Sequence, residues 1–175
     1  MNIRNSVCRF LLVLSVLSLA VAGNVFAWPG QVVSVTDGDT IKVLDPGGRQ
    51  VKIRLYGIDT PEKKQAFGQA ATKHTANMIA GKVVEIEVVD KDRYGRIVGI
   101  VLIGGKNVNQ ELVRDGYAWV YKQYCKKQEC REWQALEQAA KASRLGLWLD
   151  PAPMAPWDWR RGQRQGVSLS HDPAL

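Results

Sequence analysis

Apolar and polar residues alternate at a period of two over several short stretches, which is typical of strands with one buried face. The clearest stretch runs from Val51 to Tyr56, and similar patterns occur at residues 32–35, 41–44 and 84–88. Residues 97–103 are nearly all apolar, so we expect this fifth strand to be covered on both faces. Turn sequences rich in Asp and Gly separate the first three strands, which predicts a meander.

Longer stretches with a helical spacing of apolar residues predict three helices. We place them at residues 65–80, from Asn107 or Asn109 to Arg114, and at residues 128–145. Either asparagine can act as the N-cap of the short second helix. His74 falls on the apolar face of the first helix, and we expect it to be a packed core residue rather than a catalyst.

Five short antiparallel strands with a helix between the third and the fourth fit a small barrel. We therefore predict an α+β fold, a five-stranded OB-fold barrel with three α-helices, over residues 28–150. Such barrels bind oligonucleotides on one face. Residues 151–175 contain Pro, Trp and Arg, and we expect a partly ordered strap that frays after Gly162. The Trp and Arg side chains at 157–161 can pack on the barrel or touch nucleic acid, and the sequence leaves both open.

The first 27 residues carry the pattern of a secretory signal peptide. Two arginines precede an apolar run over residues 10–22, and small-residue cleavage sites end at Ala22 and Ala27. We expect cleavage after Ala27, which leaves a mature chain that is periplasmic or secreted. A retained membrane anchor is the alternative, but the 13 residues of the run are fewer than the roughly 20 that a spanning helix needs.

Cleavage removes Cys8 and leaves Cys125 and Cys130, which in an exported chain favours a local disulfide. Two free thiols are the alternative, because spacing alone does not decide between them. With only 2 His residues in the chain, no zinc site is expected. Loss of two arginines lowers the net charge from +7 to +5, and a small basic exported domain favours partners such as nucleic acid. We expect no membrane span after cleavage, and a monomer.

Candidate chemistry gathers where the third predicted strand ends, in the stretch Arg54–Glu62. Gly57 breaks the strand pattern, and Pro61 biases Thr60 away from helical angles, so the strand becomes a loop. One guanidinium and two carboxylates then reach the rim of the sheet, a set that suits a phosphate beside a hard metal ion. The alternative is a plain helix N-cap, since Asp or Thr followed by Pro and Glu opens many helices.

Asp39 follows the turn Asp37-Gly38, which we interpret as a hairpin turn and no more, and starts the strand that pairs with the third strand. Asp39 and Asp59 can therefore approach each other, and two carboxylates repel unless a cation lies between them. Oxygen ligands from both aspartates and the Thr60 carbonyl, completed by water and a substrate phosphate, suit calcium, with magnesium as second choice.

Glu62 lies three residues after Asp59, where it can orient or deprotonate a water molecule beside the metal. Arg54 offers a planar fork to phosphate oxygens, and Arg96, in the hairpin before the fifth strand, offers another. Two guanidiniums and one metal ion would then meet the charge that builds on phosphorus in the transition state.

Three groups of residues, taken together and in order, resemble the motifs of the thermonuclease family, whose best-known member is staphylococcal nuclease. They are Asp39-Thr40, Arg54 with Asp59-Thr60-Pro61-Glu62, and Asp92-Arg93-Tyr94-Gly95-Arg96. The similarity covers about residues 32–148. It implies an OB-fold, calcium-dependent phosphodiesterase that acts on DNA and RNA and leaves 3′-phosphorylated ends.

The resemblance also implies roles for single residues. Calcium would be held by Asp39, Asp59 and the carbonyl of Thr60. Glu62 would be the general base, and Arg54 and Arg96 the phosphate and transition-state contacts. Substrate would be bound by the hairpin pair Arg93 and Tyr94 and by tyrosines beyond the short helix, Tyr121 and Tyr124.

A second hypothesis, of a different class, is a catalytically silent OB module that binds nucleic acid or a protein. The joint presence of Asp39, Arg54, Asp59, Glu62 and Arg96 favours the enzyme. A module that only binds has no chemical need for acids and guanidiniums that converge in this way.

Overall fold

The computed structural model describes residues 27–169. The predicted signal peptide lies outside these residues except for Ala27, which is the first residue of strand β1 (Ala27–Asp37). This strand is longer than residues 32–35, because its first five residues pair with β5 (Val83–Lys91). Within residues 27–169, no helix combines the length and the apolar character needed to cross a membrane.

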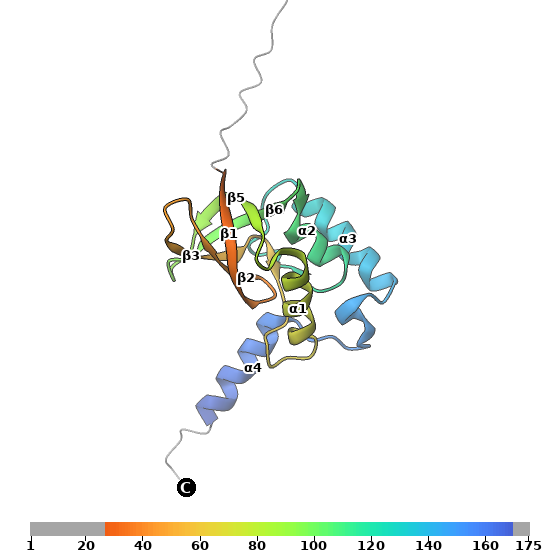
Figure 1. Ribbon diagram of the computed structural model, residues 1–175. Coiled ribbons are helices and arrows are strands. Elements are labelled where there is room, and N and C mark those ends of the chain that lie inside the picture. Colours follow the sequence, from red (N-terminus) through yellow and green to blue (C-terminus); the bar gives the residue numbers. More distant parts are fainter. Residues whose placement is uncertain (1–26, 170–175) are drawn as a thin grey trace, which may run out of the picture.

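Five strands close into a barrel (Figure 1). They are β1, β2 (Thr40–Leu44), β3 (Gln50–Leu55), β5 and β6 (Ile97–Ile103). Their order is β3-β2-β1-β5-β6, and a parallel pairing of β3 with β6 joins the two ends. The other barrel pairs are antiparallel. The predicted OB-fold barrel is confirmed, with one parallel pair that local hairpin signals do not reveal.

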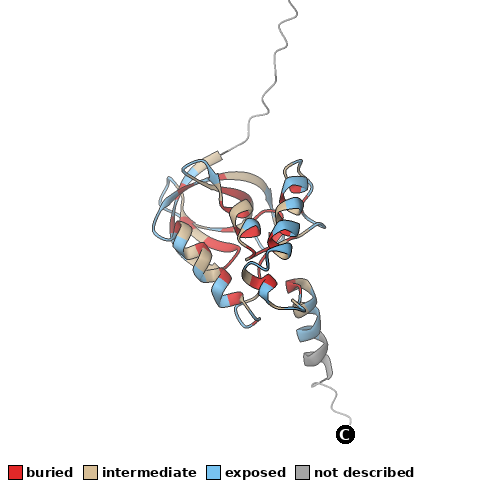
Figure 2. Cartoon of the chain, turned by 90° about the vertical axis from the view of Figure 1, so that its right-hand side faces the viewer, coloured by how far each residue is buried: buried red, intermediate tan, exposed pale blue. Residues whose placement is uncertain are grey.

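Branched apolar side chains from every barrel strand fill the interior, where Figure 2 shows the buried positions. The fully buried ones are Val32, Ile41, Val43, Ile53, Leu55, Val84, Ile86, Ile100 and Val101. In β2, β3 and β5 they recur at every second position, as the period of two predicts. Ile100 and Val101 are consecutive, so β6 is covered on both faces, as its apolar run predicts.

The described residues contain four α-helices, one more than predicted. They are α1 (Gly68–Ile79), α2 (Val108–Arg114), α3 (Cys130–Ala142) and α4 (Pro156–Leu169), with a 3-10 turn η1 (Gly146–Leu149) before α4. Three short strands were also not predicted: β4 (Ile58–Asp59), β7 (Lys106–Asn107) and β8 (Trp119–Val120). Each has two residues, too few for an alternating pattern to be visible.

The predicted strap that frays after Gly162 is wrong, because α4 continues to Leu169. Pro156 is the first residue of this helix, and Asp158 lies in its first turn. Both are signals of a helix start, since proline needs no N–H partner there and an acid suits the positive end of the dipole. In Figure 1 the first turn of α4 meets the body of the protein and the rest projects away from it.

Helix α1 begins three residues later than predicted. Residues 60–67 form turns and loop before it, so the interpretation of Asp59–Glu62 as a plain helix N-cap is wrong. His74 on α1 is half-buried. Its Nε2 lies 2.8 Å from Asp115 Oδ2, and its ring stacks on Tyr117. It therefore packs at the edge of two helices rather than inside the core.

Asn107 and Asn109 have different roles. Asn107 is the N-cap of α2, where its side chain accepts a backbone N–H at 3.1 Å. Asn109 is fully buried and joins three backbone groups. Its amide donates to the carbonyls of Tyr56 and Gly99 at 2.9 and 3.3 Å and accepts the N–H of Val101 at 3.1 Å. Asn109 therefore ties α2 to the chain that leads out of β3.

Replacing Asn109 by alanine is expected to lower the free energy of unfolding by about 3 kcal/mol, because buried backbone groups lose their partner. Asn107→Ala removes only a helix cap and is expected to cost about 1 kcal/mol. Urea denaturation of the two variants measures both values. Equal losses would contradict the bridging role of Asn109.

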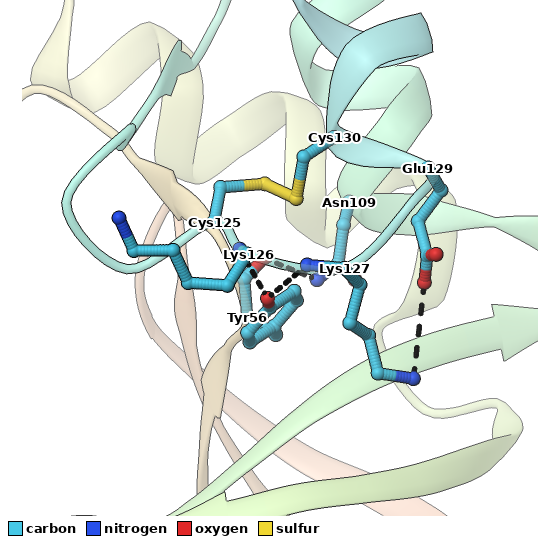
Figure 3. The surroundings of a disulfide bond; sticks show 7 residues. All are labelled: Tyr56, Asn109, Cys125, Lys126, Lys127, Glu129 and Cys130. Carbon is cyan, nitrogen blue, oxygen red and sulfur yellow. Dashed lines mark hydrogen bonds and ion pairs between the residues drawn. A yellow bond between two sulfur atoms is a disulfide. The ribbon is translucent and has the colours of Figure 1, made fainter.

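Cys125 and Cys130 form the predicted disulfide at the start of α3 (Figure 3). In the short loop between them, the N–H groups of Lys126 and Lys127 donate to the Tyr56 hydroxyl at 2.7 and 3.0 Å. Gly57 has a φ of 71°, and a Cβ at this position would lie 2.7 Å from the Cys125 sulfur. The disulfide loop thus packs directly on the turn that leads to Asp59.

Candidate active site

Arg54 joins two of the predicted metal ligands through one guanidinium. Its Nη1 lies 2.8 Å from Asp39 Oδ2, and its Nη2 donates to Asp59 Oδ1 at 2.9 Å. The two carboxylates are nearly buried, with 7% and 1% of each side chain exposed. Since neighbouring nitrogens of one planar group hold them, the structure brings the two carboxylates side by side at one end of the barrel.

Strand pairing explains how Asp39 reaches Arg54. Thr40 is the partner of Arg54 across β2 and β3, and the Asp39 carbonyl accepts the N–H of Leu55 at 2.8 Å. Asp39 itself lies in the tight turn, one residue before β2 begins. We predicted that it starts the strand, so the turn comprises Gly38 and Asp39.

The short pairing of β4 with β8 fixes Asp59, which lies opposite Trp119. The N–H of Val120, the next residue of β8, donates to the buried carboxylate of Glu137 on α3 at 3.0 Å. Thr60 then donates its N–H to Asp39 Oδ2 at 2.7 Å. Thr60 is therefore held against the two aspartates by its backbone.

Asp37 is a third carboxylate at this place, which the sequence interpretation assigned to the turn alone. Its Oδ1 accepts the Asp39 N–H at 3.2 Å. Burial, and then the charge of Asp39, raise the pKa of Asp37 to about 7. Burial also raises the pKa of Asp59, although a hydrogen bond from Arg160 and the charge of Arg54 oppose the shift. Three carboxylates are thus crowded at one place, and a cation between them would relieve their repulsion.

The donor set fits a divalent cation that prefers oxygen. The carboxylates of Asp39 and Asp59 and the carbonyl of Thr60 offer hard oxygen donors from residues that contact one another or share Arg54. Within residues 27–169, no three His, Cys, Asp or Glu side chains are grouped as a complete metal site. Two carboxylates and one carbonyl are fewer than the roughly six to eight oxygen ligands that calcium takes, so water and a substrate phosphate would complete the shell.

The backbone of Glu62 is held by Gln65. The Glu62 N–H donates to Gln65 Oε1 at 3.1 Å, and its carbonyl accepts the Gln65 N–H at 2.8 Å. Gly68 leaves room for this carbonyl, because any side chain at position 68 would collide with it. The Glu62 side chain is 37% exposed, so it faces solvent while Asp59 stays buried.

Arg160 of α4, which sequence analysis did not place in the site, lies against these carboxylates. Its Nη2 is 2.7 Å from Asp59 Oδ2, and its Nη1 is 2.7 Å from Glu62 Oε1. Burial alone would lower the pKa of Arg160, but the hydrogen bonds to Asp59 and Glu62 raise it. Arg160 follows Asp59 by 101 positions, so no local spacing reveals this contact.

Arg96 makes its ion pair outside this cluster. It precedes β6, and its Nε donates to Asp92 Oδ2 at 2.6 Å. Val98, two residues later, is the parallel neighbour of Arg54 on β3. Because residues two apart share a face of a strand, Arg96 lies on the same face of the sheet as Arg54. The second guanidinium is bonded within its own hairpin, so the expected contact of Arg96 with a phosphate stays a prediction.

Among residues 27–169, this Asp–Arg hairpin occurs twice. Arg49 donates its N–H and its Nε to the Asp45 carboxylate at 2.9 Å each, as Arg96 does to Asp92 at 3.0 and 2.6 Å. The Arg49 side chain is 84% exposed, whereas that of Arg96 is 27% exposed. The Asp–Arg pair by itself therefore stabilises a turn. What distinguishes Arg96 from Arg49 is that it lies on the same face of the sheet as Arg54.

The four residues expected to bind substrate fall into two pairs. Tyr121 follows β8, donates its N–H to the Gly57 carbonyl at 2.8 Å, and packs against the ring of Tyr124. It therefore lies beside the loop that leads to Asp59. Arg93 and Tyr94 lie in the β5–β6 hairpin with Arg96, and the Arg93 guanidinium is 5.1 Å from the centre of the Tyr94 ring.

Comparison with known proteins bears on this site. The family model described as staphylococcal nuclease homologue matches residues 52–150, which include Arg54, Asp59, Glu62 and Arg96. The chain belongs to the staphylococcal nuclease family. An uncharacterized endonuclease of Escherichia coli is 44% identical over 144 residues, which cover 78% of this chain and 92% of that protein.

Two further proteins that are similar to this chain are named as nucleases. A micrococcal nuclease of Shigella flexneri is 37% identical over 157 residues, with 83% of this chain and 89% of that protein covered. The staphylococcal-like nuclease CAN1 of Arabidopsis thaliana is 39% identical over 118 residues, which cover 67% of this chain but 36% of that protein. The family resemblance drawn from the motifs is thus confirmed.

Proposed function

We propose that the protein is an exported, calcium-dependent nuclease that hydrolyses DNA and RNA and leaves 3′-phosphorylated ends. Membership of the staphylococcal nuclease family gives the class of reaction, phosphodiester hydrolysis of nucleic acid. The observation that supports a role for calcium is the pair of buried carboxylates, Asp39 and Asp59, bonded to the single guanidinium of Arg54. This arrangement gathers oxygen ligands and a phosphate-binding group at one edge of the barrel.

Asp39, Asp59 and the Thr60 carbonyl would hold calcium, which supplies charge stabilisation to the scissile phosphate. Glu62 takes the proton of the water molecule that attacks phosphorus. The bond from phosphorus to the 5′ oxygen breaks, and that oxygen takes a proton from solvent water and leaves as a 5′ hydroxyl. The phosphate group remains on the 3′ side.

Arg54 and Arg96 bind the phosphate oxygens. Arg54 has five N–H groups, and its contacts with the two aspartates and the Leu55 carbonyl leave donors for a substrate. Arg96 can turn from Asp92 toward a phosphate on the same face of the sheet. Negative charge that develops on the phosphate oxygens is then met by two planar cations.

Export is supported by the N-terminal pattern and by the disulfide. The first 27 residues combine two arginines, an apolar run and small-residue cleavage sites. Cys125 and Cys130 are bonded, and structural disulfides persist in oxidising compartments such as the periplasm or the medium. We therefore assign the mature protein to the periplasm or the extracellular space.

The mature protein is expected to degrade both DNA and RNA in the presence of calcium and to lose this activity when a calcium chelator is added. Readdition of calcium should restore the rate, and magnesium should restore it less well, since it demands tighter octahedral geometry. The products should carry a 5′ hydroxyl, so a kinase labels them directly without prior phosphatase treatment.

Full activity in the chelator would remove calcium from the mechanism. Products with a 5′ phosphate would reverse the assignment of the broken bond. Binding of nucleic acid without any cleavage in calcium would favour the silent OB module instead.

A further inference from the structure

The first turn of α4 is docked beside the catalytic carboxylates. Gln65, whose side chain and backbone hold Glu62, also donates its Nε2 to the carbonyl of Met154 at 2.7 Å. Ala155 is buried, with 7% of its surface exposed, and Pro156 is buried as well. We call residues 150–164 the strap, a narrower range than residues 151–175 of the sequence prediction. The same glutamine thus connects the strap to the loop that carries the proposed general base.

The strap also covers the tyrosine proposed to pack on the nucleotide. Trp157 stacks on Tyr121 with ring centroids 5.0 Å apart and an interplanar angle of 15°. It meets Trp119 of β8 edge to face at 5.7 Å. An aromatic side chain of the protein therefore lies where a base would stack.

Arg160 takes the carboxylate oxygens that catalysis needs. Asp59 Oδ1 accepts hydrogen bonds from Arg54 at 2.9 Å and from Arg160 at 3.2 Å. Asp59 Oδ2 accepts a hydrogen bond from Arg160 at 2.7 Å. Glu62 Oε1 accepts the same guanidinium at 2.7 Å. A divalent cation on Asp59 would lie against this positive charge, and the ion pair with Arg160 would make the Glu62 carboxylate a weaker base. The contacts of Arg160 therefore compete with the proposed chemistry.

We propose that the strap closes the active site of the cation-free protein and that calcium displaces Arg160 from Asp59 and Glu62. This inference rests on the proposed function. Arg160 acts as an internal counter-ion for the two carboxylates, and Trp157 leaves Tyr121 when the strap opens. Only the open fraction of the protein binds calcium, so a strap closed about 90% of the time weakens the apparent calcium affinity about tenfold.

The test is a calorimetric titration of calcium into the full mature chain without nucleic acid. Arg160→Ala is expected to bind calcium about tenfold more tightly than the wild type, because the competing guanidinium is gone. The matched control is Arg161→Ala, which removes the same charge from the next position of the helix. Arg161 is 67% exposed, and its Nη1 lies 3.7 Å from Asp158 Oδ1, a weak ion pair. The calcium affinity of Arg161→Ala is therefore expected to stay within about twofold of the wild type.

Hydrogen exchange over residues 150–164 gives a second readout that does not depend on activity. In the wild type, calcium should reduce the protection of the strap, and in Arg160→Ala the protection should be low with or without calcium. Trp157→Ala leaves Arg160 in place but removes the stacking on Tyr121. It should also tighten calcium binding, by less than Arg160→Ala does, and it provides the test if Arg160→Ala does not fold.

The outcomes separate the two proposals. Equal calcium affinity in Arg160→Ala and the wild type, or weaker binding in the variant, would overturn the strap mechanism. The proposal of a calcium-dependent nuclease would remain. Calcium binding that leaves the protection of residues 150–164 unchanged would also overturn it. Absence of calcium binding in every variant would refute the calcium site, and the strap mechanism with it.

Discussion

Replacing Glu62 by glutamine is expected to lower kcat for DNA cleavage by about 10²–10⁴-fold, the range typical of a general base. The amide keeps the size of the side chain and its backbone contacts with Gln65, but it cannot accept the proton of the attacking water. Initial rates at saturating DNA and calcium measure the effect. The calcium affinity should change much less than kcat, because the proposed ligands are Asp39, Asp59 and Thr60.

The matched control for this variant is Glu85→Gln. Glu85 is exposed on β5, and the structure places none of the proposed site residues beside it. Its replacement should leave kcat within about twofold of the wild type. A wild-type rate from Glu62→Gln would refute the role of general base. A loss of calcium affinity as large as the loss of kcat would instead make Glu62 a ligand.

The barrel and the approach of Asp39 to Arg54 could be predicted because their signals are local. Alternation at a period of two marks the strands, and a tight turn forces β2 back along β1 and toward β3. Once Thr40 lies opposite Arg54, the turn residue before it must reach the guanidinium. The disulfide was foreseen for a similar reason, since five positions separate the two cysteines of an exported chain.

The contacts that sequence reasoning missed are those that depend on where remote elements dock. Arg160 meets Asp59 only because α4 begins at Pro156 and packs against β8 through Trp157. The sequence does signal the helix, through a proline followed by an acid in the first turn, but it carries no signal for the element against which the helix packs. Asn109 is similar, because a helix cap and a buried bridge look alike in sequence, and tertiary packing decides between them.

Asp37 was missed for another reason. The sequence Asp-Gly-Asp-Thr is a strong turn signal, and that local explanation made a second role for the first aspartate unnecessary. Yet the fold half-buries this carboxylate at the end of β1 beside Asp39, and its pKa rises to about 7 as a result. A local structural role therefore does not exclude an electrostatic role in the site, and the second role becomes visible only with the fold.

Arg96→Ala is expected to lower kcat by about 10²–10³-fold, the usual cost of removing one preorganised donor from a transition state. The reason is its place on the same face of the sheet as Arg54, from which its guanidinium can turn from Asp92 to a phosphate oxygen. Steady-state cleavage of a short DNA in calcium measures the loss. Arg96→Lys should recover only part of it, because an ammonium group lacks the planar fork.

The second Asp–Arg hairpin makes this prediction unusually well controlled. Arg49→Ala removes the same ion pair from the same kind of turn, since Arg49 and Asp45 repeat the hydrogen bonds of Arg96 and Asp92. Arg49 is 84% exposed and Arg96 27% exposed, so Arg49→Ala is expected to cost less stability than Arg96→Ala. If Arg96 serves only to hold its turn, neither variant will lose more than about twofold in kcat. If Arg96 contacts the reacting phosphate, kcat will fall in Arg96→Ala alone.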